Sequence, residues 1–523
     1  MTAKTNPASV NLFADLNDLD LLRLTKFQSF LYSLIHFFKG IPVWLVSVFK
    51  SAGKAIGKGF KAVKEDVADI GRTFAQGDYK TKLSFLIMGF GSIARGQIFR
   101  GLLFLLFEVV FIVYMITAGF HWLGKLVTLG EATSGTVYDP VLDTYVRVAG
   151  DDSFKCLLYG LLTIIFIICF IYTWRLNARQ NRDAEALIRA GKKLKSAKDD
   201  VSSLVDESFH KTLLALPLTG IFFFTVFPII FMILVAFTNY DGAHDGYSNL
   251  FTWVGLSNFN ALFNLNTGSN NLSVAFGEIL SWTLIWAFFA TFTNYFLGMF
   301  VAIMINKKGI KLKKLWRGIL VLTIAIPQFV SLLYVSKMFS SSGLVNGLLM
   351  KFGFITDTTQ LIRFWETSNL ARIMVIVINI WIGIPYLMLI STGVLMNIPA
   401  DLYESANIDG ANAAQQFFKI TLPYMLFVTG PYLLTQFIGN INNFNVIFLL
   451  SGGGPDNLKL LTSAGAAGDT DLLITWLFKI TTGAESKYYL ASVIGIMIFV
   501  VVSILSLIAY NVMPSTRNEE DFS

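Results

Sequence analysis

The sequence predicts an all-α integral membrane protein with about eight transmembrane helices. Of its 523 residues, 54% are hydrophobic and only 14% are charged, whereas soluble domains carry about 25% charged residues. The apolar residues gather in runs of about 20, the length that an α-helix needs to cross a bilayer. We expect spans at residues 101–120, 156–174, 214–237, 280–305, 318–337, 372–394, 425–446 and 489–511.

The charges between these runs predict the orientation of the spans. The connections after the second and fourth runs are rich in Lys and Arg, whereas residues 238–278 contain neither. Loops rich in Lys and Arg stay in the cytoplasm, so we expect both termini to be cytoplasmic (N-in/C-in). The net charge of +7 fits this bias, and its scatter along the chain gives no reason to expect a nucleic-acid partner.

The chain before the first span has a different character. Its apolar positions recur at helical steps (Phe49, Gly53, Ile56, Phe60, Val63, Val67 and Ile70), and Lys50, Lys54, Lys58 and Lys61 form a basic stripe beside them. This pattern is typical of a helix on an anionic membrane surface. Packing against the protein's own cytoplasmic side is the alternative. The apolar run 83–90 is too short to span and is expected to be re-entrant or interfacial.

Four regions follow from these patterns. Residues 1–83 form a cytoplasmic or interfacial basic amphipathic region, and residues 84–212 form two N-terminal transmembrane helices with a basic cytoplasmic connection. Residues 213–513 form a core of six transmembrane helices, and residues 514–523 form a cytoplasmic tail.

The sequence contains no motif that would make the chain an enzyme. It has no Gly-x-x-x-x-Gly-Lys-Ser/Thr phosphate loop, no His-Glu-x-x-His and no Gly-x-Ser-x-Gly. Its two cysteines and four histidines form no metal-binding pattern. We therefore expect no cofactor or metal in this chain.

Polar residues within the spans are mostly amides. Ion-coupled transporters usually place Asp, Glu or His in their spans, but spans three to eight are nearly free of charge. Glu108, in the first span, is the exception, and we expect it to pair with a neighbouring helix or reach the interface rather than serve function. The amides are Gln328, Asn379, Gln436, Asn440, Asn442 and Asn443. Amides both donate and accept hydrogen bonds, so they suit a neutral, hydroxyl-rich ligand.

The loop between the sixth and seventh runs predicts a short helix with both ends defined. Asp401 is placed to cap it, with Glu404 three residues later. Gly410 is placed to end it in the left-handed conformation. A second amphipathic piece, 413–420, leads to Pro423, where we expect the next span to begin. A capped helix between two spans is suited to act as a rigid peg.

This loop resembles the EAA loop of ABC importer permeases. The family pattern is Glu-Ala-Ala, a Gly four residues later, and then Ile-x-Leu-Pro; the matching residues are Glu404, Ala406, Gly410, Ile420, Leu422 and Pro423. Ser405 stands where the family often has Ala. The resemblance implies that this EAA coupling helix inserts into a groove on a cytoplasmic ATPase. Its coupling residues would be Glu404, Ser405, Ala406, Asp409 and Gly410.

Three further segments, 237–240, 254–259 and 449–455, look like those of sugar-importer permeases. The resemblance is greatest to the larger, MalF-type permease subunit of maltose/maltodextrin importers. It implies a bacterial cytoplasmic membrane, a second homologous permease, an ATPase homodimer that binds ATP and Mg, and an extracytoplasmic sugar-binding protein. Enterobacterial members carry a large domain between spans three and four. This chain has about 40 residues there, which points by analogy to a Gram-positive source and against binding-protein contact through such a domain.

Two stretches of the spans match the sugar site of these permeases. Gly383 and Pro385 are expected to loosen one helix, and Gln436, Asn440 and Asn443 are spaced to share one helical face. The resemblance implies a sugar site at Asn379, Gly383, Tyr386, Gln436, Gly439, Asn440 and Asn443. Gly439 replaces an aromatic residue of the family, which predicts a wider or shifted site. Amide hydrogen bonding between helices is the alternative.

The predicted function is the translocation of maltose or maltodextrins by alternating access in an ATP-driven importer. Two alternatives stay open. One is a permease for another solute, either a different neutral oligosaccharide or an anion such as glycerol phosphate; the scarcity of Arg and Lys in the spans disfavours an anion. The other is a secondary transporter that works without an ATPase.

Overall fold

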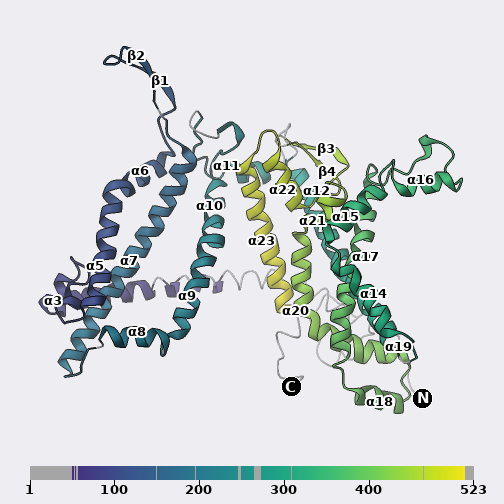
Figure 1. Cartoon of the computed structure of the whole chain (residues 1–523), viewed down its shortest axis with the longest axis horizontal. Coiled ribbons are helices and arrows are strands. Elements are labelled where there is room, and N and C mark those ends of the chain that lie inside the picture. Colours follow the sequence, from purple (N-terminus) through teal and green to yellow (C-terminus); the bar gives the residue numbers. More distant parts are fainter. Residues whose placement is uncertain are drawn as a thin grey trace, which may run out of the picture. The chain divides into compact units, whose positions relative to one another are not determined.

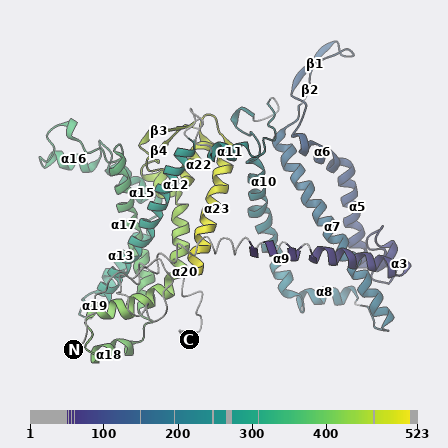
Figure 2. The same ribbon diagram turned by 180° about the vertical axis from the view of Figure 1, so that it is seen from behind.

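A computed structural model describes residues 50–512, apart from 52, 55, 56, 60, 149, 195, 245–248, 264–271, 308, 463 and 464. The expectations about residues 1–49, about the tail at 514–523 and about the side on which the termini lie fall outside these residues. The described chain is helical except for two short hairpins (Figures 1 and 2).

The elements are as follows. From residue 79 to 235 they are α3 (Tyr79–Leu83), α4 (Phe90–Ile93), α5 (Ile98–Tyr114), η1 (Met115–Gly119), α6 (Phe120–Thr128), β1 (Gly135–Asp139), β2 (Thr144–Val148), α7 (Ser153–Arg189), α8 (Ala197–Val205), α9 (Phe209–Ile221), η2 (Phe222–Val226) and α10 (Phe227–Val235). From 242 to 450 they are η3 (Gly242–His244), α11 (Ser257–Phe263), α12 (Leu272–Phe288), η4 (Phe289–Thr293), α13 (Asn294–Asn306), α14 (Lys313–Ala325), α15 (Gln328–Met338), α16 (Leu344–Lys351), η5 (Thr358–Gln360), α17 (Ser368–Leu395), α18 (Ala400–Ile408), α19 (Ala413–Gln416), η6 (Phe417–Thr421), α20 (Leu422–Ile441) and α21 (Phe444–Leu450). The last are β3 (Asp456–Thr462), β4 (Gly465–Gly468), α22 (Leu473–Thr482) and α23 (Tyr488–Val512).

Seven helices in the described part of the chain are long and apolar enough to cross a membrane. A bent pair of helices makes an eighth if it is counted as one span, which agrees with the predicted number. The seven are Ile98–Thr128, Ser153–Arg189, Phe209–Val235, Leu272–Asn306, Ser368–Leu395, Ala413–Ile441 and Tyr488–Ala509. Four of them contain a five-residue π-helical turn, at η1, η2, η4 and η6.

The fifth predicted span is not straight. α14 and α15 meet at 88°, where Ile326 is extended and Pro327 precedes α15. Proline has no N–H to donate and disfavours a helical conformation in the residue before it, so the chain turns there. Pro385, by contrast, lies inside α17, which continues unbroken through Gly383. The predicted loosening therefore occurs at Pro327 and not at Pro385.

The chain divides into two compact units. Among the described residues, the first comprises 50–120 and 164–216, and the second 121–163 and 217–512. In the first unit, the run 83–90 forms turns between α3 and α4. Its Met88 N–H donates to Glu108 Oε2 at 2.8 Å, and its Gly89 N–H donates to Asn177 Oδ1 at 3.1 Å. Glu108 is thus paired, as expected, but with this turn rather than with a neighbouring helix.

The second unit is built around a large apolar core that α12, α22 and α23 share. Two antiparallel hairpins, β1–β2 and β3–β4, extend from it. The first is closed at its base by Asp151, whose carboxylate accepts from Lys125 and from the backbone N–H groups of Glu131 and Ala132. The hydrogen bond from Lys125, followed by those from the backbone, lowers the pKa of Asp151 to about 2. Apart from these two short hairpins, the described chain has the all-α fold that the sequence predicts.

Candidate functional site

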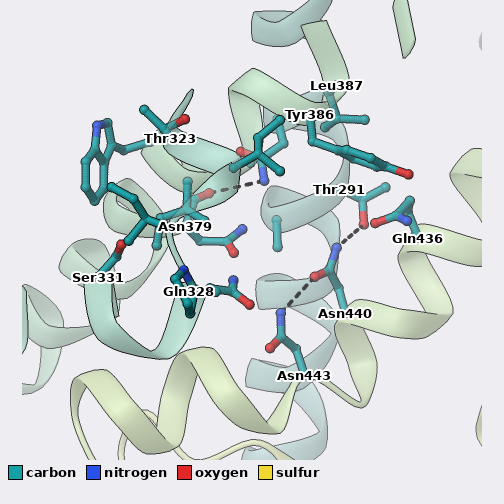
Figure 3. Close-up of a pocket in the computed structure, with 18 of the residues that line it drawn as sticks. Thr291, Thr323, Gln328, Ser331, Asn379, Tyr386, Leu387, Gln436, Asn440 and Asn443 are labelled. Carbon is teal, nitrogen blue, oxygen red and sulfur yellow. Dashed lines mark hydrogen bonds between the residues drawn. The ribbon is translucent and has the colours of Figure 1, made fainter. Parts of the chain in front are cut away.

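A cavity of about 500 Å³ lies between the helices of the second unit (Figure 3). Its wall comes from five places: the η4 turn and the start of α13, the break between α14 and α15, the middle of α17, the second half of α20, and the cap of α21. Segments more than 100 residues apart in the sequence therefore meet at one site.

Six of the seven predicted sugar-site residues line this cavity. They are Asn379, Gly383, Tyr386, Gln436, Asn440 and Asn443. Gly439 is not among the lining residues; it is exposed, and a Cβ built there would meet no atom within 4 Å. It neighbours Asn440 on a helix, where successive residues point about 100° apart. The expectation that Gly439 widens the site therefore has no support from its position.

One step in the sequence argument was wrong. Asn443 does not share a helical face with Gln436 and Asn440, because α20 ends at Ile441 and Asn443 caps α21, accepting from the Val446 N–H at 3.3 Å. The tertiary fold nevertheless brings the three side chains together at the cavity wall. Asn443 Nδ2 donates to Asn440 Oδ1 at 3.2 Å, and Asn440 Nδ2 donates to Thr291 Oγ1 at 3.0 Å (Figure 3).

Several lining residues were not among the predicted sugar-site residues. They are Thr291, Asn294, Thr323, Gln328, Ser331, Trp381 and Tyr432. Gln328 was expected only as one of the amides that suit a neutral ligand. Thr291 and Asn294 lie in and just after the π-helical turn η4, which shifts the helical register, so periodicity alone does not assign them to one face. The residues from α14 and α15 meet the cavity because of the break at Pro327. The proline in the Ile-Pro-Gln sequence there is the feature of the sequence that could have indicated the break.

Gly383 lets two helices approach closely. A Cβ at this position would lie 2.3 Å from Asn294 Nδ2, and that nitrogen donates to the Asn379 carbonyl at 3.4 Å. No other amino acid fits between α13 and α17 without moving Asn294. Gly383 thus determines where the Asn294 amide stands at the cavity wall.

The cavity wall is neutral and its hydrogen-bonding capacity is not fully used. Within the described chain, none of the lining residues carries a charge. Asn294 Oδ1, Asn379 Nδ2 and the Tyr432 hydroxyl are buried and have no hydrogen-bond partner among the described residues. Such groups are costly to leave unpaired. The side chains of Trp381 and Tyr386 are about half exposed and offer apolar ring faces. This wall suits a neutral ligand with many hydroxyl groups.

The predicted EAA helix is α18, and its C-terminus has the expected form. Gly410 has φ +73°. The Ala411 N–H donates to the Ala406 carbonyl at 2.9 Å, and the Gly410 N–H donates to the Asn407 carbonyl at 3.1 Å. This pair of bonds is a Schellman motif, which satisfies carbonyls that a helix end would otherwise leave free.

The N-terminus of α18 differs from the prediction. The helix begins at Ala400, and the cap position is Pro399, without a side-chain hydrogen bond. Asp401 therefore lies inside the first turn and does not form a capping box with Glu404. Its carboxylate still favours the helix, because negative charge near a helix N-terminus is stabilising.

The chain after α18 forms a single long helix. Asn412 caps it reciprocally with Gln415, and it runs from Ala413 to Ile441, 29 residues. The expectation of a separate piece that ends before Pro423 was wrong, because the η6 turn joins α19 to α20 without a break. Tyr403 on α18 shares a hydrogen bond of 2.8 Å with Thr421 of this turn.

α18 is open to contact with other molecules. Glu404, Ser405, Asp409 and Gly410 are exposed, and Ala406 is half-buried. In Figure 1, α18 lies at the opposite end of the second unit from the β3–β4 hairpin. The fold and the site together define the class. The protein is a multi-span helical membrane protein with a neutral polar cavity among its spans and, at one end, an exposed helix that is joined to a span on each side.

Comparison with known proteins identifies the family within this class. Residues 294–518 match the family described as "Binding-protein-dependent transport system inner membrane component". The chain is 34% identical over 438 residues to the maltodextrin transport system permease protein MalC of Streptococcus pneumoniae, a match that covers 82% of this chain and 95% of MalC. It is 34% identical to the maltodextrin permease MdxF of Bacillus subtilis (84% and 97% covered) and 32% identical to the galactooligosaccharide permease GanP of the same species (83% and 97% covered).

The chain therefore belongs to the family of binding-protein-dependent transport system inner membrane components, the permease subunits of ABC importers. The resemblance to maltose/maltodextrin permeases that the EAA loop and the other segments indicated is confirmed. Subunits of this family are multi-pass membrane proteins without catalytic activity of their own, in agreement with the missing catalytic motifs.

Proposed function

We propose that this chain moves maltose and maltodextrins across the bacterial cytoplasmic membrane through the cavity lined by Asn440 and Asn443. The observation that carries the proposal is the neutral wall with unpaired amide and hydroxyl groups. Oligosaccharides present many hydroxyls that both donate and accept, and amides match either role. The relatives named for maltodextrin transport support this substrate class.

The energy for transport comes from partners in this proposal. An ATPase homodimer binds ATP and Mg and receives α18 in a groove, where Glu404, Ser405, Ala406, Asp409 and Gly410 make the contact. A second, homologous permease completes the pathway, and an extracytoplasmic binding protein delivers the sugar. Closure of the ATPase pair shifts the spans between inward-facing and outward-facing states, as in other alternating-access systems. The exposure of α18 supports this role. We further propose that both termini are cytoplasmic and that the six spans of 213–513 form the transport core.

The relation to GanP makes galactooligosaccharides the second candidate substrate. Both classes are neutral and rich in hydroxyls, so the cavity chemistry favours neither. Competition decides between them: cells that carry the complete transporter are expected to take up labelled maltotriose, and an excess of unlabelled galactooligosaccharide is expected to leave that uptake unchanged. Cells that take up labelled galactooligosaccharide but not labelled maltotriose would replace the proposed substrate.

The cavity itself is tested by two asparagines that lie two positions apart. Asn440→Ala removes an amide that faces the cavity and that bonds to both Thr291 and Asn443. We expect maltotriose uptake to fall about tenfold, because each hydrogen bond is worth about 1 kcal/mol. Asn442 is exposed and does not line the cavity, so Asn442→Ala is expected to leave uptake unchanged. Equal uptake in the two variants, at equal amounts of protein in the membrane, would exclude the cavity as the sugar site.

A further inference from the structure

The helical segment 61–76 of the first unit has three distinct sides. Acidic and small polar residues, Asp66, Asp69 and Thr73, lie on one side, and the apolar residues Val63, Val67, Ile70 and Phe74 lie on the next. A third side carries Lys61, Lys64 and Arg72, all exposed. This division follows from the 3.6-residue period of the helix.

The acidic side holds the segment to α7. Asp66 forms ion pairs with Arg175 and Arg179, and Asp69 forms one with Arg182. The Asp66 side chain is only 10% exposed. In both views of the molecule the segment runs across α7 and not along it (Figures 1 and 2). The segment is therefore held against the protein itself, but through its charged side and not through its apolar stripe.

The apolar stripe is only partly covered by the first unit. Val63, Val67 and Phe74 are 54%, 62% and 50% exposed. Such a stripe on a helix that is already fixed in place needs an apolar environment from outside the unit.

The contacts place this stripe where α7 changes from apolar to charged. Residues 156–174 of α7 are apolar, and the arginines that hold the segment begin at Arg175. Trp174 stands at the transition and donates to the Phe85 carbonyl at 3.0 Å. The Phe85 ring packs edge-on against both Trp174 and Phe74, at 5.5 and 5.3 Å. Tryptophan and arginine at the end of an apolar run are typical of the membrane–water interface.

We propose that residues 61–76 form an interfacial anchor that binds the anionic headgroups of the bilayer around the end of α7. Val63, Val67 and Phe74 enter the boundary between headgroups and acyl chains. Lys61, Lys64 and Arg72 attract negatively charged phospholipids, which is the charge complementarity that selects lipid as the occupant. The anchor does not depend on which sugar the cavity binds.

The test uses the full-length chain in nanodiscs of phosphatidylcholine alone or mixed with phosphatidylglycerol. In a background with Cys156 and Cys169 replaced by Ala, an environment-sensitive fluorophore is attached at Val67→Cys or, as the matched control, at Glu65→Cys. Glu65 lies about 200° around the helix from Val67, on the basic side. We expect the label at 67, but not at 65, to shift to the blue and to be quenched by lipids with a spin label near the headgroup. A label at 67 that is quenched by iodide in water as strongly as the label at 65 would overturn the anchor.

The charge requirement has its own measurement. Lys64→Gln is expected to reduce the ratio of lipid-docked to undocked label at position 67 about fivefold in discs with phosphatidylglycerol, since one basic residue near an anionic surface is worth about 1 kcal/mol. Lys351→Gln, on α16 of the second unit, is the control and is expected to have no effect. Protection at position 67 without quenching by lipid, or without dependence on the anionic lipid, would assign the stripe to a protein partner and would overturn the proposal.

Discussion

The cavity and the α18 loop differ in how completely their polar groups are paired. Around α18, the Schellman motif at Gly410 and the reciprocal cap at Asn412 use the backbone groups that helix ends leave free. In the cavity wall, Asn294, Asn379 and Tyr432 each keep an unpaired polar atom. The end of α18 and the start of the next helix, whose backbone groups are paired internally, hold their shape and can transmit a displacement. A ligand that enters the cavity can pair with the polar groups that the wall leaves unused, and these hydrogen bonds stabilise the complex.

The largest effect is expected from a change in the α18 loop, where helix ends are paired internally. Gly410→Val places a β-branched residue at φ +73°, a conformation that costs L-residues about 1–2 kcal/mol and β-branched ones more. We expect maltotriose uptake and sugar-stimulated ATP hydrolysis by the assembled transporter to fall at least about tenfold. Sugar binding to the cavity should persist.

Its matched control is Gly347→Val. Gly347 also has open space around its Cβ position but has no positive φ, so transport should be normal. If both valine variants transport like the wild type, the turn at Gly410 has no part in coupling.

The next largest effect is expected from a change in the cavity wall. Gly383→Ala would bring a methyl group to 2.3 Å from Asn294 Nδ2, and relieving such overpacking costs about 1–3 kcal/mol. We expect the KM for maltotriose uptake to rise about tenfold, while ATP hydrolysis in the absence of sugar stays unchanged. Gly439→Ala is the control, since its Cβ position is open and lies outside the cavity. A raised KM in Gly439→Ala, with a normal one in Gly383→Ala, would place the site elsewhere on α20.

The smallest effect is expected from the loss of the helix cap at Asn412, beside α18. Asn412→Ala removes one of the two caps beside α18, and the loss of an N-cap costs about 1 kcal/mol. We expect a two- to fivefold loss of coupled transport, measured as sugar taken up per ATP hydrolysed, with an unchanged KM. Asn412→Ser, which can still cap the helix, should restore the wild-type ratio. A change in KM would show that the cap acts on the cavity and not on coupling.

How far the sequence predicted these features depends on the range of the forces involved. The spans and the turn at Gly410 follow from local properties, namely apolar length and the preference of glycine for positive φ. The two prolines show the limit: Pro327 breaks its span and Pro385 does not. Each of them follows an isoleucine, Ile326 and Ile384, so the local sequence does not tell them apart. The same holds for Asn443, which reaches the cavity from the cap of α21, and for Thr291, whose direction depends on a π-helical turn that periodicity does not show.

The unbroken helix from Ala413 to Ile441 connects the two regions. Asn412 caps its start beside α18, and its far end carries Gln436 and Asn440 at the cavity wall. At 1.5 Å per residue it is about 43 Å long. A tilt of about 10° around its centre therefore displaces each end by about 4 Å, more than the length of a hydrogen bond. We propose that this helix moves as one body, so that a ligand entering the cavity and a displacement of α18 change its tilt together.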